Sequence, residues 1–309
     1  MIWGLMLLAV IFFVVTNIVG NLVYDGTVGA KPHVKAEAMT DFYEQNEQDV
    51  MSQLSKYEMT SKMIESKKNG YEIETLSLKS PIESENVMII VHGITSNYYE
   101  VLDTALLYLE QGYHVVVYHQ RQTGTTGGEN FTFGLYERFD LDEVVTYAKQ
   151  LYPNGTLGVH GFSMGAATTA MHSALNEEKK LVNFYVLDAP YHSMESAVEL
   201  GIKAENIKGL PIRFAKWAGN MVIKAKAGFL YQDILPIEAV RQASVPVLFI
   251  HGTADVVTSP QSSQLMFDAM THDQNELWLV DGIGHCDVVK VMPEIYIEKI
   301  MSFIEKYVK

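Results

Sequence analysis

Residues 156–167 read TLGVHGFSMGAA and give the strongest indication of the fold class. Its first part, Thr156–His160, is typical of a buried strand, and the small residues after Gly165 suit a helix that packs closely on that strand. Between them lies the pattern G-x-S-x-G, centred on Ser163. A sharp strand-to-helix turn strains the serine backbone, projects the hydroxyl above the sheet and aims helix N–H groups at a developing oxyanion. The placement of the pattern therefore predicts that Ser163 is a nucleophile.

Strands and helices alternate along the chain around this turn. Short continuous apolar runs are typical of buried parallel strands. Repeated βαβ units predict an α/β fold with a doubly wound, mostly parallel sheet, whose site lies beyond the carboxyl ends of the strands. The expected strands are Tyr71–Leu78, Val87–Val91, Tyr113–Tyr118, Thr156–His160, Asn183–Leu187, Val247–Ile250 and Leu277–Val280, and the expected helices include Asn97–Glu110, Phe139–Leu151, one from Ser163 and Glu294–Tyr307.

Two loops after later strands carry the partners that a serine nucleophile needs. A serine hydroxyl is a poor nucleophile without a base, and His285 follows the last expected strand in the glycine-rich segment DGIGH. Asp255, in the segment HGTAD, is the candidate acid that would orient His285. Asp188, at the end of the preceding strand, is the alternative acid. We therefore predict Ser163, Asp255 and His285 as the catalytic residues.

An oxyanion hole needs two backbone N–H groups near the serine. The first is expected from Met164, the residue that follows Ser163. The second is expected from Ile94, in a loop where Gly93 permits a close turn. His92 is expected to hold this loop in place.

The segments VHGITSN, GFSMG, HGTAD and GIGHC, in that order, resemble the α/β-hydrolase superfamily over residues 71–309. Residues 121–141 are similar to a narrower group, the bacterial, N-terminally membrane-anchored hydrolases of the serine aminopeptidase-like branch. The resemblance implies an α/β-hydrolase fold that uses Ser163, Asp255 and His285 in this chain order. The loop Arg121–Gly128 reads RQTGTTGG and departs from the R-G-H-G-x-S-x-G that is usual in the branch. This loop is expected to border the pocket.

A long insertion separates Asn183–Leu187 from Val247–Ile250. Connections of this length are usually functional, and the resemblance implies a helical cap over the active site at about residues 191–240. One interpretation of its centre, Gly201–Leu230, is a solvated basic face on ordinary helices. The other is a basic, apolar surface for anionic lipid headgroups or an acidic substrate. This centre holds one acidic residue, Glu205, and the basic residues Lys203, Lys208, Arg213, Lys216, Lys224 and Lys226.

The N-terminus is predicted to be a single transmembrane helix in residues 1–24. The charge-free stretch Ile2–Tyr24 would be about 35 Å long as a helix, enough to cross a hydrocarbon core of about 30 Å. A buried helix and a signal peptide cleaved after Val28-Gly29-Ala30 are the alternatives. Lys31 and Lys35 favour a cytoplasmic body, but two lysines leave the side of the membrane open.

Residues 25–70 are expected to form a polar helical connector between the anchor and a hydrolase domain at 71–309. The segment Ala36–Lys68 contains neither Gly nor Pro and has apolar residues at loosely helical spacing. It would be an amphipathic connector packed on the body or, alternatively, a regulatory or partner-binding helix. Asn69-Gly70 is expected to end it.

Composition narrows the function classes. Of 309 residues, 48% are apolar and 19% are charged, so the chain has ample material for a core. A net charge of −14 argues against nucleic acid as the main partner, because phosphate binding needs a basic surface. The single cysteine, Cys286, excludes an intramolecular disulfide and a cysteine-rich zinc site.

These features together predict a membrane-anchored serine hydrolase that cleaves a carboxylic ester or related acyl compound without metal or organic cofactor. A lipid is one candidate for this acyl substrate. A serine aminopeptidase or amidase is the alternative. An acyltransferase fits the same acyl-enzyme, since an alcohol competes with water for it. A non-catalytic binding protein that keeps the fold is the remaining alternative.

Overall fold

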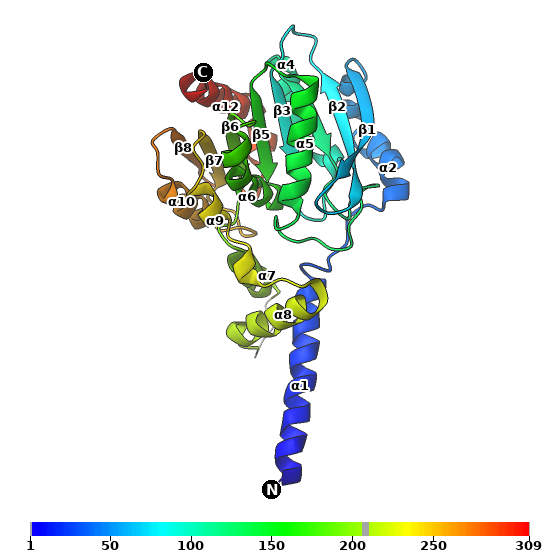
Figure 1. Cartoon of the computed structure of the whole chain (residues 1–309), viewed down its shortest axis with the longest axis vertical. Coiled ribbons are helices and arrows are strands. Elements are labelled where there is room, and N and C mark those ends of the chain that lie inside the picture. Colours follow the sequence, from blue (N-terminus) through cyan, green and yellow to red (C-terminus); the bar gives the residue numbers. More distant parts are fainter. Residues whose placement is uncertain (1, 206–209, 309) are drawn as a thin grey trace.

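The computed structural model describes residues 2–205 and 210–308, and an eight-stranded sheet lies at its centre (Figure 1). The strand order is β1-β2-β4-β3-β5-β6-β7-β8. The β1–β2 and β2–β4 pairs are antiparallel and the other pairs are parallel, which confirms the predicted doubly wound, mostly parallel sheet. The strands are β1 (Glu58–Ser66), β2 (Tyr71–Lys79), β3 (Val87–Val91), β4 (His114–Tyr118), β5 (Leu157–Phe162), β6 (Phe184–Asp188), β7 (Val247–Gly252) and β8 (Asn275–Val280).

Helices cover both faces of this sheet because strands β3 to β7 are buried on both sides. Residues of α3, α4 and α12 share one apolar cluster with the sheet, and residues of α5, α6, α9 and α10 share the cluster on the opposite face. The helices are α1 (Ile2–Asp25), α2 (Met39–Asn46), α3 (Gln48–Leu54), α4 (Leu102–Glu110), α5 (Glu137–Leu151), α6 (Met164–Lys179), α7 (Met194–Ala204), α8 (Ile212–Ala227), α9 (Pro236–Val240), α10 (Pro260–Ala269), α11 (Val288–Val291) and α12 (Pro293–Tyr307), with short 3-10 turns at Ala36–Ala38, Tyr98–Val101 and Tyr231–Asp233.

The expectation that residues 25–70 form a helical connector is wrong in its second half. Only Met39–Leu54 is mainly helical, whereas Glu58–Ser66 is an edge strand of the sheet. It pairs with β2 along its whole length, from Glu58 opposite Lys79 to Ser66 opposite Tyr71. Its side chains are mostly exposed and charged or polar, as is usual for an edge strand, so the sequence shows no apolar alternation. Hydrogen bonding to β2 decides the structure here, and the sheet begins at residue 58.

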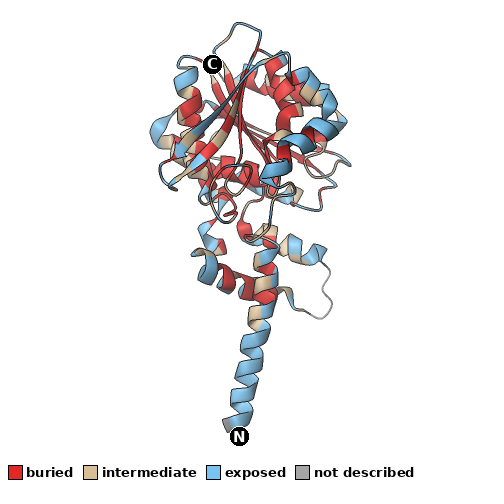
Figure 2. Cartoon of the chain, turned by 90° about the vertical axis from the view of Figure 1, so that its right-hand side faces the viewer, coloured by how far each residue is buried: buried red, intermediate tan, exposed pale blue. Residues whose placement is uncertain are grey.

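Helix α1 projects from the body, and only its last turns are packed (Figures 1 and 2). Its large apolar side chains from Trp3 to Val15 are exposed, whereas Val19 and Val23 are buried. The buried turns contact α8, and they share an apolar cluster with the β6–β7 insertion that includes Ala218, Ile223 and Tyr231.

Close backbone approach fixes this contact between α1 and α8. A β-carbon on Gly20 would lie 2.4 Å from a methyl group of Val222 and 2.6 Å from the carbonyl oxygen of Ala218. From the other side, a β-carbon on Gly219 would lie 2.5 Å from a methyl group of Val23. Side chains at either glycine would force the helices apart.

Replacing Gly20 by alanine should therefore destabilise the full-length protein by about 1–3 kcal/mol, the usual range for overpacking a well-filled contact. The matched control is Gly4→Ala in the same helix, because a β-carbon at Gly4 meets nothing within 4 Å. The midpoint of thermal unfolding of the detergent-solubilised chain measures the stability of both variants. Equal midpoints for Gly20→Ala and Gly4→Ala would contradict the α1–α8 contact.

Candidate active site

Ser163 occupies a strained turn between β5 and α6. Its φ of 54° and ψ of −117° lie in a region that non-glycine residues seldom adopt. The flanking glycines make the turn feasible, because α6 presses against the sheet. A β-carbon on Gly161 would lie 2.3 Å from the carbonyl oxygen of Gly165, and one on Gly165 would lie 2.2 Å from that of Val91. The two glycines of the G-x-S-x-G pattern are therefore required by close backbone contacts.

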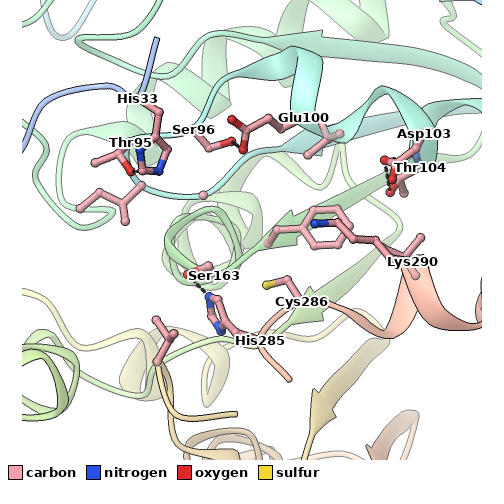
Figure 3. A pocket seen from close by; sticks show the side chains of 16 residues that line it. His33, Thr95, Ser96, Glu100, Asp103, Thr104, Ser163, His285, Cys286 and Lys290 are labelled. Carbon is pink, nitrogen blue, oxygen red and sulfur yellow. Dashed lines mark hydrogen bonds between the residues drawn. The ribbon is translucent and has the colours of Figure 1, made fainter. Parts of the chain in front are cut away.

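The structure brings the three predicted catalytic residues into one hydrogen-bonded line. Ser163 Oγ lies 2.9 Å from His285 Nε2 (Figure 3). On the other side of the ring, His285 Nδ1 lies 2.6 Å from Asp255 Oδ2. Each residue follows a different parallel strand, since Ser163 follows β5, Asp255 follows β7 and His285 follows β8. These strands end at one edge of the sheet, so residues far apart in the sequence meet there.

The carboxylate of Asp255 is buried and saturated with hydrogen bonds. Its Oδ1 accepts the N–H groups of Val257 at 2.7 Å and Thr258 at 2.9 Å. Its Oδ2 lies 2.9 Å from the Thr258 hydroxyl and 3.1 Å from His251 Nε2. Burial alone would raise the pKa of Asp255, but the hydrogen bonds from His251, His285 and Thr258 outweigh it and hold the pKa well below its usual range. Asp255 is therefore an anion that faces His285.

Sequence reasoning missed the residues that support this carboxylate. The Thr258 hydroxyl also lies 3.2 Å from His285 Nδ1 and 3.1 Å from the carbonyl oxygen of Ala189. His251 is held by Ser263 Oγ, 2.7 Å from its Nδ1. The available signal was the spacing of Asp255 and Thr258, because an aspartate that accepts N–H groups two and three residues later forms a local turn.

The residues expected to form an oxyanion hole lie beside Ser163. Met164 is buried as the first residue of α6, and Ile94 lines the same cavity as Ser163. The neighbouring loop approaches closely, since a β-carbon on Gly93 would touch Ser163 Cβ at 3.5 Å. Thr95, with φ of 60°, turns the chain after Ile94.

His92 is structural, as expected. Its Nε2 accepts the Gln120 N–H at 3.0 Å, which leaves Nδ1 as the donor to the Gly93 carbonyl oxygen at 2.8 Å. Burial is the main cause that lowers the pKa of His92 to about 4, so the ring is neutral near pH 7.

Asp188, the alternative acid, has a different set of partners. Its Oδ2 accepts the Tyr296 hydroxyl at 2.6 Å. That hydroxyl lies 3.0 Å from His160 Nε2, and Tyr108 lies 3.0 Å from His160 Nδ1. These buried groups form a polar chain within the core beneath the site. Burial, opposed by the Tyr296 hydrogen bond, raises the pKa of Asp188 to about 6.

Ser163 and His285 open into a cavity of about 330 Å³ (Figure 3). His33 and Thr95 lie toward one end, and Asp103 and Lys290 toward the other. The side chain of His33 is held by Thr95 Oγ1 at 2.8 Å, so the segment after α1 reaches the site. Apolar side chains line much of the remainder, among them Ile94, Val101, Phe162, Val257 and Val289.

Two segments expected at the cavity do not line it. Among the described residues, none in the insertion at 191–240 lines it. The apolar side chains of the insertion share one cluster with Val19 and Val23 of α1 and with Met164 beside Ser163. Loop Arg121–Gly128 does not line it either. There, Gln122 Nε2 donates to the Ala30 carbonyl oxygen at 2.7 Å, and the Arg121 guanidinium lies over the Tyr71 ring.

The raised pKa of Asp188 makes stability depend on pH. The folded chain keeps this proton up to about pH 6, whereas the unfolded chain loses it near 3.8, so the folded state binds more protons between these values. Stability from this group therefore falls as pH rises through that window, by at most about 3 kcal/mol. The variant Asp188→Asn should lose this dependence.

Chemical unfolding at pH 4.5 and 7.5 measures the effect, with Asp273→Asn at an exposed carboxylate as the control. An unchanged difference between the two pH values in Asp188→Asn would show that Asp188 is not the group responsible.

The chain is similar in sequence to known proteins. A family model described as "alpha/beta hydrolase fold" matches residues 86–227. Protein YqkD of Bacillus subtilis (strain 168), described as uncharacterized, is 28% identical over 228 residues, which cover 72% of each chain.

Solved structures give the same answer for the fold. The Pyrococcus furiosus esterase Pf2001 superposes with a TM-score of 0.68 at 23% identity, over 84% of this chain and 94% of that one. The Pyrococcus horikoshii acylaminoacyl peptidase has a TM-score of 0.60 at 17% identity, over 82% of this chain but 42% of that one. The sheet order, the strained serine turn and these matches together establish that the chain has the α/β-hydrolase fold.

Proposed function

We propose that the protein is a serine hydrolase that cleaves carboxylic esters through an acyl-enzyme on Ser163. The observation that carries this proposal is the line from Ser163 Oγ to His285 Nε2 at 2.9 Å and from His285 Nδ1 to Asp255 at 2.6 Å. A nucleophile, a base and an anionic group that orients the base are the parts that acyl transfer needs. Their placement at the mouth of a cavity gives a substrate access.

In the first half of the reaction, Ser163 Oγ attacks the carbonyl carbon of the ester, and His285 Nε2 takes the hydroxyl proton. The Asp255 carboxylate holds the ring with its proton on Nδ1 and stabilises the imidazolium that forms. The tetrahedral intermediate collapses, and His285 gives the proton to the departing alcohol. Water then attacks the acyl carbon while His285 takes its proton, which forms a second tetrahedral intermediate. That intermediate collapses with cleavage of the bond between the acyl carbon and Ser163 Oγ, His285 returns the proton to Oγ, and the acid leaves.

The negative charge on the tetrahedral oxygen needs fixed donors. We assign this role to the backbone N–H groups of Met164 and Ile94, because Met164 begins α6 directly after Ser163 and Ile94 lines the facing side of the cavity. The N-terminal end of α6 adds a favourable electrostatic field.

The cavity supports acyl groups of short to medium length. Its volume of about 330 Å³ is at the lower end of the range for small-molecule sites, and much of its wall is apolar. The Pf2001 esterase among the similar structures adds support for this class.

The full-length protein should hydrolyse p-nitrophenyl esters, with turnover that peaks at one acyl length. The variant Ser163→Ala should lower kcat by roughly 10⁶, and Asp255→Asn by roughly 10³–10⁴, because the wrong tautomer of His285 then faces the serine. The matched variant Asp188→Asn should stay within about tenfold of wild type, since Asp188 bonds to Tyr296 rather than to His285.

Labelling by a fluorophosphonate probe is the second readout, because it requires an activated serine whatever the substrate. Full labelling of the Ser163→Ala variant would contradict the role of Ser163 as the nucleophile. Equal losses of labelling in Asp255→Asn and Asp188→Asn would contradict the specific role of Asp255.

An aminopeptidase or amidase is the second candidate. Glu100 and Asp103 line the cavity and would be the groups to hold a substrate ammonium. However, Glu100 already accepts the hydroxyls of Tyr43 at 2.6 Å and Ser96 at 2.8 Å. Asp103 accepts the N–H of Thr104 at 2.6 Å, and burial raises its pKa above the ordinary value. Both carboxyls are therefore less suited to an ammonium group than free carboxylates, which favours the esterase.

Aminoacyl p-nitroanilides should accordingly be turned over far more slowly than esters. Asp103→Asn should leave ester KM within a few fold, because no charge at Asp103 is needed to bind a neutral ester. Anilide turnover that equals ester turnover and disappears in Asp103→Asn would establish the peptidase instead.

We also propose that α1 is an uncleaved, single-pass membrane anchor, which agrees with the closer resemblance to anchored hydrolases of the serine aminopeptidase-like branch. The helix is long and apolar enough to cross a membrane. Cleavage after Ala30 would remove Val19, Val23 and Val28, which are buried against the insertion. Deleting residues 1–30 would therefore expose an apolar surface, so activity is best measured on the full chain.

A further inference from the structure

If α1 crosses a bilayer, the turns that pack against α8 lie at membrane depth. The exposed large apolar side chains of α1 run from Trp3 to Val15 and continue at Ile18 and Leu22, about 30 Å of helix in all. A hydrocarbon core is also about 30 Å thick. To span it, α1 must therefore be in the membrane up to the turns near Leu22. Those turns contain Val19, Gly20 and Val23, which pack against α8.

Helix α8 therefore lies at the level where α1 leaves the hydrocarbon. It runs across α1, between the body and the exposed end of α1 (Figure 1). The Phe12 ring lies 6.1 Å from Phe214 and 6.0 Å from Trp217, centroid to centroid. Phe12 is about 10 Å nearer the N-terminus of α1 than Val19. Phe214 and Trp217 consequently lie on the side of α8 that faces the inserted end.

An apolar stripe on α8 is open to solvent in the isolated chain. Trp217 is 46% exposed and Met221 is 50% exposed, and their spacing of four residues places them on one helix face. Large aromatic side chains of this kind gather where a bilayer meets water.

The charge on α8 has a single sign. The helix Ile212–Ala227 contains Arg213, Lys216, Lys224 and Lys226 and no acidic residue, in a chain of net charge −14. Lys216 is paired with Glu195 and Glu199. Over the described residues, Arg213, Lys224 and Lys226 make no salt bridge with a carboxylate. Lys208, the other basic residue expected in this segment, lies outside the described residues.

We infer that α8 is a membrane-docking helix: its stripe of Phe214, Trp217 and Met221 enters the bilayer interface, and Arg213, Lys224 and Lys226 contact anionic lipid headgroups. Amphipathic helices with basic residues beside an apolar face bind membranes in this manner. The inference rests on the proposed anchoring by α1 and is independent of the chemistry at Ser163.

Single-tryptophan variants of the full-length chain test the inference. The sequence has three tryptophans, Trp3, Trp217 and Trp278, so two substitutions leave one reporter. The Trp217 reporter carries Trp3→Phe and Trp278→Phe, and the Trp3 reporter carries Trp217→Phe and Trp278→Phe. Both are reconstituted in phosphatidylcholine vesicles with and without phosphatidylglycerol, using acyl chains brominated near the headgroup. We expect bromine to quench both reporters, and we expect quenching of Trp217 to increase with phosphatidylglycerol.

Removing the charges tests the headgroup contact. In the Trp217 reporter, the triple change Arg213→Gln, Lys224→Gln and Lys226→Gln should abolish the dependence on phosphatidylglycerol. The matched control changes Lys67, Lys179 and Lys290, which lie outside α8, to Gln and should keep this dependence.

The outcomes separate the two proposals. An unquenched Trp3 would refute the anchor. A quenched Trp3 with an unquenched Trp217 would refute the docking of α8 alone. If Trp217 is unquenched by brominated lipid and also shielded from acrylamide, a second copy of the chain covers the stripe, and the inference is equally overturned. If quenching of Trp217 still increases with phosphatidylglycerol after the triple change, the assigned headgroup contacts are overturned.

Discussion

The close contact between α6 and the ends of β3 and β5 is the constraint on which the rest of the site depends. Ser163 keeps its positive φ because α6 packs very closely on the sheet, so that a β-carbon on Gly165 would lie 2.2 Å from the carbonyl oxygen of Val91. The absence of side chains at Gly161 and Gly165 permits this approach. The strain costs on the order of 1–3 kcal/mol and persists because the buried strands on both sides leave the turn no room to relax. With the hydroxyl fixed above the sheet edge, the loops after β7 and β8 need only present one carboxylate and one imidazole to complete the line.

The hydrogen bonds around Asp255 show how a buried carboxylate stays ionised at the carboxyl edge of the sheet. Two N–H groups, one hydroxyl and two imidazoles surround it, and none of these groups belongs to a lysine or arginine. The negative charge is thus left available to an imidazolium at His285, since no permanent cation neutralises it. Asp188 shows the contrasting case. It is also buried but accepts one hydroxyl, that of Tyr296, and burial raises its pKa.

Much of this arrangement was predictable from the sequence because its signals are local. The strand, the glycine-flanked serine and the small residues after it occupy a dozen consecutive positions, and His285 and Asp255 directly follow apolar strands. Three features were not predictable in this way. Strand β1 carries no apolar alternation, and its structure depends on the free edge of β2. Thr258 and His251 gain their roles from a carboxylate whose orientation only the folded loop defines. The insertion has the expected helices, but it shares an apolar cluster with α1, which is far away in the chain, and none of its described residues lines the cavity.

The segment between α1 and the body has a consequence for how such a hydrolase would meet its substrate. His33 lines the cavity only eight residues after α1 ends at Asp25, and it is bound to the loop that carries Ile94. If α1 spans a membrane as proposed, a serine tethered this closely to it would work at a nearly constant height above the lipid surface. Its encounters with a lipid substrate would take place in two dimensions, so the reaction rate would follow the mole fraction of substrate in the surface rather than its bulk concentration. Diluting such a substrate with inert lipid would slow the enzyme even at constant total substrate.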